Sequence, residues 1–118
     1  MKFITNYKSS SYDYRIIKSK IKFIIIHYTA INSLSATLKW LCNPKSKVSS
    51  HFLISKNGII YQLVNENCRA WHAGKSKWKN ITDINSYSLG IELQNTGHHL
   101  NFENFAKKQM NSLVKLTK

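Results

Sequence analysis

The dipeptide Asn57-Gly58 constrains the fold more than any other feature of the sequence, because it separates two short runs rich in β-branched and aromatic residues. The runs are residues 52–56 and 59–64. Asn and Gly both tolerate the positive φ of a type I′ turn, which joins twisted antiparallel strands. The sequence therefore predicts a β-hairpin at this point.

Two more strands and a helix are predicted around the hairpin. Residues 21–28 form an almost continuous apolar run, which is typical of a strand covered by helices on both faces. Ser33 is a suitable N-cap for a helix that reaches Leu41, and proline after Asn43 ends it. Residues 87–93 predict another strand, in which Gly90 indicates close backbone approach. The pattern favours an α/β fold.

The two ends of the chain and one long segment complete the domain organisation. Residues 1–20 have no periodic signal and predict an irregular N-terminal arm, while residues 21–118 belong to one domain, as the length of 118 residues indicates. Residues 68–86 predict a long surface loop. Asn101 would cap a final helix over residues 102–117 with one apolar face.

The charge is strongly basic, with 18 Lys and Arg against 5 Asp and Glu and a net charge of +13. Only Arg15 and Arg69 are arginines, the residue best suited to phosphate and guanine contacts, so nucleic acid is not the expected partner. A lysine-rich surface would still attract anionic ligands. No apolar run is long enough for a transmembrane segment and no secretory signal is visible, so a cytoplasmic location is expected.

The sequence contains five histidines and two cysteines, the residue types most often found in metal and redox sites. Cys42 and Cys68 have no metal-binding spacing and predict free thiols, with a single disulfide as the alternative. His51 precedes the hairpin and is interpreted as structural. His98 and His99 are interpreted as a solvated loop pair, since neighbours rarely ligate one tetrahedral ion without further partners.

The strongest candidates for chemistry are His27, Glu92 and the loop AWHAG, which contains Trp71 and His72. A neutral imidazole at a strand end can bind zinc, but it is also a common hydrogen-bonded core residue. Glu92 lies between apolar residues, where burial would raise its pKa and suit it to proton transfer; alternatively it faces solvent. Trp71 and His72 would line a sugar- or peptide-binding groove or anchor the loop to the sheet.

Four stretches in order carry a family resemblance: FIIIHYTA at residues 23–30, SSHFLISKNGIIYQLV at 49–64, AWHAG at 70–74 and SLGIELQNTG at 88–97. The sequence resembles the zinc-dependent N-acetylmuramoyl-L-alanine amidases, relatives of peptidoglycan recognition proteins, from about residue 22 to the end. The resemblance implies a mixed central β-sheet flanked by helices.

The resemblance also implies a site and a reaction. His27 matches the first zinc ligand of the family, and Glu92 matches the acidic residue that activates water. Trp71 and His72 match a segment that lines the substrate groove without binding metal. The implied cofactor is Zn²⁺. The implied partner is peptidoglycan or a muropeptide, cleaved at the amide between the lactyl group of N-acetylmuramic acid and L-alanine.

The sequence departs from the family at its C-terminal end. The family's other two zinc ligands, a histidine and an aspartate or cysteine, normally follow the last helix in text such as GHSDIAP, which this chain lacks. A catalytic zinc needs about three protein ligands. We therefore expect a fold that is incomplete at the C-terminus and an incomplete zinc site, completed by a second polypeptide. The alternative is a non-catalytic binder of peptidoglycan fragments.

Overall fold

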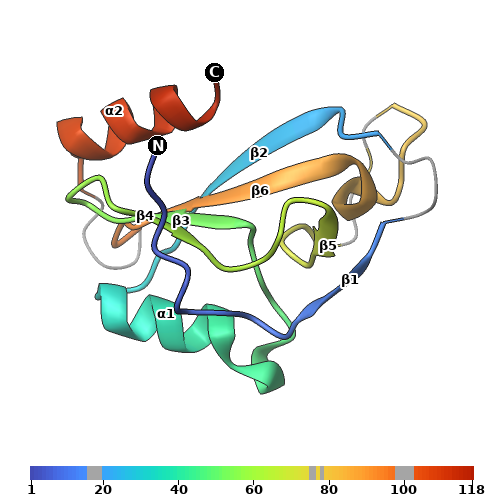
Figure 1. The fold of residues 1–118 in the computed structure, drawn as a ribbon, viewed down its shortest axis with the longest axis horizontal. Coiled ribbons are helices and arrows are strands. Elements are labelled where there is room, and N and C mark those ends of the chain that lie inside the picture. Colours follow the sequence, from blue (N-terminus) through green and yellow to red (C-terminus); the bar gives the residue numbers. More distant parts are fainter. Residues whose placement is uncertain (16–19, 75–76, 78, 98–102) are drawn as a thin grey trace.

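A four-stranded mixed sheet lies at the centre of the molecule (Figure 1). The computed structural model describes residues 1–15, 20–74, 77, 79–97 and 103–118. The strands of the sheet lie in the order β2 (Phe23–Tyr28), β6 (Ser88–Leu93), β3 (Phe52–Ile54) and β4 (Ile60–Gln62). Strands β2 and β3 run parallel to β6, and β4 is antiparallel to β3. The mixed sheet expected from the resemblance is confirmed.

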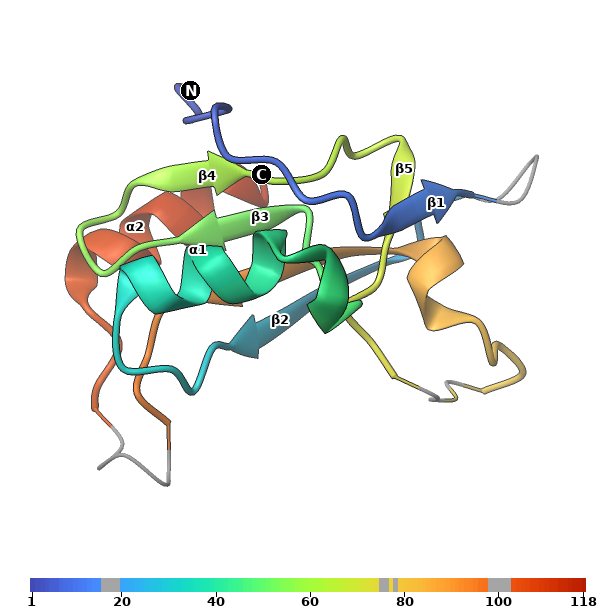
Figure 2. The same ribbon diagram turned by 90° about the horizontal axis from the view of Figure 1, so that it is seen from below.

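Two helices pack on opposite faces of this sheet, α1 (Leu34–Cys42) on one and α2 (Lys107–Leu116) on the other (Figures 1 and 2). Each face has its own apolar core, because successive side chains of a strand point to opposite sides. In β3, for example, Leu53 packs in the core beneath α1, whereas Phe52 and Ile54 pack in the core beneath α2. The flanking helices expected from the sequence are confirmed.

The hairpin between β3 and β4 is confirmed, but its turn is not of type I′. Gly58 has a φ of +84°, whereas Asn57 does not adopt a positive φ. The Gly58 amide donates to the Ser55 carbonyl at 2.9 Å, and the Ser55 amide donates to the Ile59 carbonyl at 2.9 Å. A turn followed by a left-handed glycine is the three-residue hairpin loop, which needs only one residue with positive φ.

Helix α1 begins and ends where the sequence indicates. The Ser33 hydroxyl accepts a hydrogen bond from the Ala36 amide at 3.0 Å, as an N-cap does. Asn43 leaves the helical conformation at φ −80° and ψ 120°, as a residue before proline prefers, and Pro44 opens a short 3-10 helix, η1 (Pro44–Ser46).

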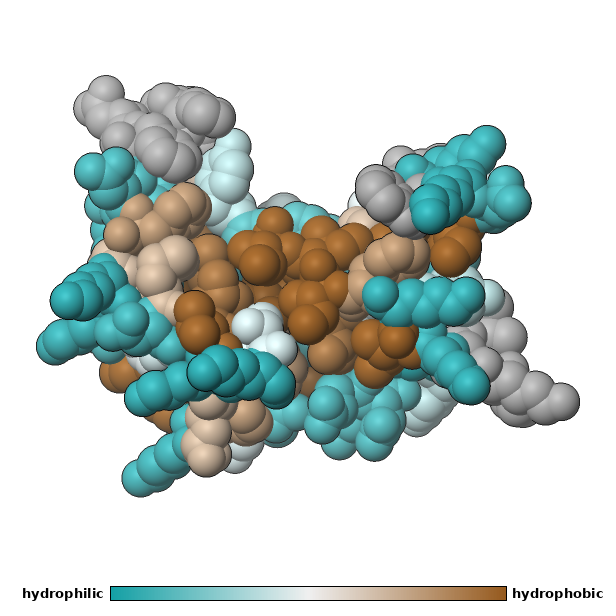
Figure 3. Space-filling model, turned by 90° about the horizontal axis from the view of Figure 1, so that it is seen from above, coloured by the Kyte–Doolittle hydropathy of each residue, from teal (hydrophilic) through white to brown (hydrophobic). Residues whose placement is uncertain are grey.

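Strand β2 differs from its prediction, since only one of its faces is covered. It is an edge strand of the sheet, and Ile24, Ile26 and Tyr28 are 45%, 50% and 41% exposed. Figure 3, which looks onto this side of the sheet, shows apolar side chains across the middle of the face. The continuous apolar run therefore reflects one half-buried face and one exposed apolar face rather than two helical layers.

The final helix is shorter than predicted and begins at Lys107. Asn101 and Phe102, the expected cap and first residue, lie outside the described residues. Glu103 is used in an extended connection instead: its carbonyl accepts from Asn95 Nδ2 at 3.0 Å, and its carboxylate pairs with Lys56 Nζ at 2.6 Å. These tertiary contacts keep the chain out of a helical conformation until Ala106, where ψ is still 145°.

Two segments that were expected to be irregular contain short strands. The N-terminal arm includes β1 (Tyr12–Tyr14), and the loop over residues 68–86 includes β5 (Cys68–Ala70) and the 3-10 helix η2 (Ile84–Tyr87). Strands β1 and β5 pair antiparallel as a separate two-stranded sheet. Sequence patterns miss such pairs because three residues show no periodicity and the partners are far apart in the chain.

Cysteine and membrane expectations can be compared directly with the described part of the chain. Cys42 and Cys68 are both free and half-buried, so the predicted free thiols are confirmed. None of the helices described here has the length and apolar character needed to cross a bilayer.

Candidate active site

His27 and Glu92 occupy paired positions on neighbouring strands. In the parallel register of β2 and β6, His27 lies opposite Glu92, and Glu92 in turn lies opposite Leu53 of β3. Residues paired in this way project to the same face of a sheet. Leu53 belongs to the core beneath α1, so both candidate residues lie on the α1 side of the sheet.

The environment of Glu92 favours the protonated form of the side chain. Its Oε2 atom is buried and has no hydrogen-bond partner among the described residues. Burial raises the pKa of Glu92 to about 7, because the charged carboxylate loses hydration that nothing nearby replaces. A carboxyl group with a pKa near neutrality can both accept and return a proton.

His27 is a neutral imidazole with one ring nitrogen engaged. Its Nε2 lies 3.1 Å from His72 Nδ1, and the two rings meet edge to face with centroids 5.3 Å apart. Burial lowers the pKa of His27, so the neutral form is favoured further. The second nitrogen, Nδ1, has no hydrogen bond to the described residues, and a free lone pair on a neutral imidazole is what a zinc ligand requires.

The loop AWHAG brings His72, but not Trp71, to this place. Burial lowers the pKa of His72 to about 3, with smaller contributions from nearby positive groups. The backbone of Trp71 is held by Ser49, and its indole Nε1 is buried without a partner among the described residues. Trp71 is partly buried and does not line the cavity described below, and its role in substrate binding remains a prediction.

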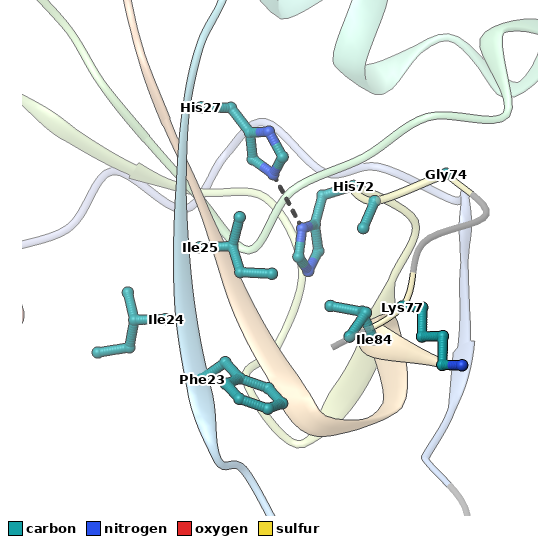
Figure 4. Close-up of a pocket in the computed structure, with 9 residues that line it drawn as sticks. Phe23, Ile24, Ile25, His27, His72, Gly74, Lys77 and Ile84 are labelled. Carbon is teal, nitrogen blue, oxygen red and sulfur yellow. Dashed lines mark hydrogen bonds between the residues drawn. The ribbon is translucent and has the colours of Figure 1, made fainter. Parts of the chain in front are cut away.

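A cavity of about 530 Å³ opens beside the two histidines (Figure 4). Phe23 and Ile25 of β2 line it on one side, and Ile84 and the loop containing Ala73 line it on the other. The wall is mostly apolar, with His27 and His72 as its imidazoles. A pocket with an apolar wall and a few converging polar groups is typical of a ligand site.

His51 has the structural role that the sequence suggests. Its Nδ1 accepts from the Gly90 amide at 3.0 Å, and its Nε2 lies 2.8 Å from the Cys68 carbonyl, which fixes a neutral ring. Burial lowers the pKa of His51 to about 4. His98 and His99 lie outside the described residues.

Sequence reasoning missed the residues that hold the AWHAG loop in place. The Asn85 side chain accepts from the amides of His72 and Ala73 at 3.3 and 2.9 Å and donates to the Ala73 carbonyl at 3.0 Å. Ser88 Oγ lies 2.9 Å from His72 Nε2. Asn85 lies in η2 and Ser88 begins β6, and neither has a distinctive sequence signal, because their partners become visible only in three dimensions.

The described residues provide part of a metal site. His27 offers one imidazole nitrogen, and the nearby acid, Glu92, is buried and partly protonated at neutral pH. Over the ranges that the structure describes, no three His, Cys, Asp or Glu side chains come together as a metal-binding group. The donor set therefore fits zinc at one position, and these residues alone do not complete a site of about three protein ligands.

A mixed β-sheet that presents a neutral imidazole and a buried carboxyl group on one face is suited to metal-assisted hydrolysis. Comparison with known proteins narrows this class. Residues 17–118 match the family model described as N-acetylmuramoyl-L-alanine amidase. The chain belongs to this family of amide hydrolases.

Two curated relatives illustrate the match. The chain is 39% identical over 111 residues to N-acetylmuramoyl-L-alanine amidase AmiD of Escherichia coli, covering 84% of this chain and 39% of AmiD. It is 44% identical over 71 residues to 1,6-anhydro-N-acetylmuramyl-L-alanine amidase AmpD of Haemophilus influenzae, covering 60% of this chain and 36% of AmpD. The chain thus spans about two fifths of the length of these relatives.

Solved structures agree with the fold. A selenomethionine derivative of AmpD superposes with a TM-score of 0.77 at 25% identity, covering 98% of this chain and 71% of that one. Escherichia coli AmiD, in complex with anhydro-N-acetylmuramic acid-L-Ala-D-γ-Glu-L-Lys, superposes with a TM-score of 0.70 at 38% identity, covering 81% of this chain and 41% of AmiD. The expected family and fold class are confirmed.

Proposed function

We propose that this chain carries part of the active site of a zinc-dependent N-acetylmuramoyl-L-alanine amidase, namely one zinc ligand, His27, and the proton-transfer residue, Glu92. The reaction is hydrolysis of the amide between the lactyl group of N-acetylmuramic acid and L-alanine in peptidoglycan or a muropeptide. Family membership supports the reaction type, and the AmiD complex with an anhydromuramyl tripeptide supports the substrate class. The chain spans only part of the length of its relatives. The activity is therefore proposed for a complete zinc site, to which this chain contributes some of the residues.

The single observation that carries the proposal is the position of Glu92. It is a buried carboxyl group without a hydrogen-bond partner at Oε2 among the described residues, and it lies next to His27 in the strand register. Leaving such a group unsatisfied destabilises the fold, and a functional requirement explains why it is retained. Its pKa of about 7 suits a group that takes up and returns one proton per cycle.

His27 would hold the metal through Nδ1. Zinc bound there would supply Lewis acidity toward the amide carbonyl and toward water. The remaining ligands would have to come from residues outside those described or from a second polypeptide, and we retain the second polypeptide as a proposed partner.

Glu92 would perform the proton transfers. The carboxylate takes a proton from the attacking water while the new C–O bond forms at the lactyl carbonyl carbon. The protonated side chain then gives this proton to the nitrogen of L-alanine as the C–N bond breaks. The products are the lactyl carboxylic acid and the free amine of the stem peptide, and Glu92 returns to its starting state. The apolar wall of Phe23 and Ile25 would exclude competing water from the side of His27 that faces the cavity.

Product analysis of a muropeptide by mass spectrometry tests the proposal. The parent chain, supplied with zinc and a synthetic peptide that carries a GHSDIAP-like ligand loop, should release a peptide with a free L-alanine amine, and chelator should stop the release. Glu92→Gln should lower the rate at least about 100-fold, in line with the loss of a general base. Glu66→Gln is the matched control, because Glu66 is exposed in the described structure and lies outside the cavity. Equal rates for Glu92→Gln and the parent would contradict the assignment.

Muropeptide binding without hydrolysis is a second candidate function. The observation that favours it is that the described residues do not assemble three metal-ligating side chains. In that case a muropeptide would bind with the same dissociation constant in zinc and in chelator, and no peptide would be released. Release of peptide in the presence of zinc, but not in the presence of chelator, would eliminate this candidate.

A further inference from the structure

A chain of hydrogen bonds connects His27 to the start of strand β6. His27 Nε2 lies 3.1 Å from His72 Nδ1, and His72 Nε2 lies 2.9 Å from Ser88 Oγ. The Ser88 hydroxyl lies 2.8 Å from the Ile84 carbonyl and donates to it. Figure 4 shows the side chains of His27 and His72 pointing toward one another beside β2, with a dashed line between their ring nitrogens.

The direction of each bond follows from the number of protons available. The Ser88 hydroxyl has one proton, and the Ile84 carbonyl can only accept. With that proton committed, Ser88 Oγ must accept from His72, which places the His72 proton on Nε2. His72 Nδ1 then holds a lone pair, so His27 must donate from Nε2. The unprotonated nitrogen of His27 is thereby fixed as Nδ1.

The backbone around His72 is built to hold the ring in this position. Asn85 binds the amides of His72 and Ala73 and fixes the loop. A Cβ atom at Gly90 would lie only 2.4 Å from His72 Cγ, so this position must be glycine for the ring to lie against β6. The Ser88 side chain is fully buried, which keeps water from competing for His72 Nε2.

We propose that Ser88 and His72 are positioning residues that set the tautomer of His27 and so present its Nδ1 lone pair to the metal. The proposal rests on the proposed function for the metal, but the tautomer assignment stands on the hydrogen bonds alone. His72 thus acts through His27, rather than through the substrate contact that the family resemblance implies. Metal-binding histidines generally need a partner for the second nitrogen, and loss of such a partner weakens metal affinity about 10- to 100-fold.

Long-range ¹H–¹⁵N correlation spectra of the metal-free chain test the tautomers directly. His27 and His72 should both give the pattern of a neutral ring protonated at Nε2. Ser88→Ala should leave His72 without its acceptor and produce mixed tautomers at both rings. Ser50→Ala is the matched control, since Ser50 is equally buried and donates to a backbone carbonyl, and it has no bond to the three imidazoles described here. A His27 ring protonated at Nδ1, or one unaffected by Ser88→Ala, would overturn the proposal.

A second pair of variants separates positioning from folding. The side-chain oxygen of His72→Asn can replace Nδ1 as an acceptor, whereas His72→Phe keeps the ring shape without one. Zinc titration should give a dissociation constant within about threefold of the parent for His72→Asn and one raised about 10- to 100-fold for His72→Phe. Equal losses in both variants would overturn the positioning role. If the parent binds no zinc even with a synthetic peptide that carries the GHSDIAP-like ligand loop, but shows the expected tautomers, the proposed function fails and the tautomer assignment stands.

Discussion

Glu92 links the proposed chemistry to the stability of the fold at the scale of single residues. Burial raises the pKa of its carboxyl group from the ordinary value of 4.5 to about 7. The folded chain therefore binds more protons than the unfolded chain between these two pH values, and the stability it gains is present at low pH and is lost as pH rises through about 7. The same property that suits Glu92 to proton transfer makes it a destabilising group at pH values above its ordinary pKa of 4.5.

Glu92→Gln should therefore stabilise the metal-free fold increasingly as pH rises. The free energy of unfolding of the variant, relative to the parent, should increase by roughly 3 kcal/mol at most between pH 4 and pH 8.5, since one pKa unit corresponds to about 1.4 kcal/mol. Urea denaturation at both pH values measures the difference. A difference that does not change with pH would show that Glu92 is not held in a desolvating environment.

Gly90 gives a sharper test of the close contact with His72. Gly90→Ala would place a methyl group 2.4 Å from His72 Cγ, so the ring must move and lose its bond to His27. We expect a loss of about 1–3 kcal/mol in the free energy of unfolding. Gly74→Ala, where a Cβ atom would meet nothing within 4 Å, is the control and should change stability by less than about 0.5 kcal/mol.

Single elements differ in how far the sequence predicts them, for physical reasons. Local signals in Ser33, Pro44 and the Asn57-Gly58 pair are sufficient for α1 and the hairpin, because caps and turns involve neighbours in sequence. The start of α2 is not predictable in this way, since Glu103 is drawn into bonds with Asn95 and Lys56 that depend on the folded chain. Strands β1 and β5 are missed for the same reason.

The residues of the candidate site also differ in whether local sequence signals or tertiary contacts reveal them. The sequence predicts His27 and Glu92, because His27 ends an apolar strand, Glu92 lies between apolar residues and both match the resembled family, and the strand register brings them together. Ser88 and Asn85 carry no distinctive local pattern, and their importance depends on the position of His72 in space. The contact between His27 and His72 joins β2 to a loop 45 residues away and has no signature in the sequence.

Arg15, which follows β1, links η2, β6 and the segment between β4 and β5. Its replacement therefore tests contacts between elements. Its guanidinium group donates to the carbonyls of Asn85, Ser86 and Ser88 at 2.9–3.0 Å, and to that of Glu66 at 3.1 Å. Arg15→Met should lower the free energy of unfolding by about 2 kcal/mol or more, because several carbonyls lose a charged donor. Lys45→Met, at an exposed position in η1, should have no measurable effect.

Hydrogen exchange locates the expected effect of Arg15→Met. Amides of β1, β5 and η2 should exchange faster, while those of β3, in the buried core, should change only with global stability. Uniform acceleration across all strands would contradict a local role for Arg15.

At the scale of the whole molecule, the uncovered side of β2 is the main departure from an ordinary soluble surface. Ile24, Ile26 and Tyr28 are exposed there, and Val114 of α2 is 54% exposed. Contiguous apolar surface of this kind promotes association. The net charge of +13 opposes association by repulsion at low salt, so the balance depends on ionic strength.

We therefore expect self-association that increases with salt and that decreases in Ile26→Lys. Sedimentation velocity at about 0.05 and 0.5 M salt measures it, with Ile59→Lys as a control at an exposed isoleucine outside this face. If Ile59→Lys reduces association as much as Ile26→Lys, the apolar face of β2 is not responsible.

Zinc titration of the parent and of His27→Ala by calorimetry, each with a synthetic peptide that carries the GHSDIAP-like ligand loop, tests the central claim most directly, because it asks whether this imidazole holds the metal. The account predicts a dissociation constant at least about 100-fold higher in His27→Ala and a value within about threefold of the parent in Glu92→Gln. Equal zinc affinity in the parent and His27→Ala would contradict it.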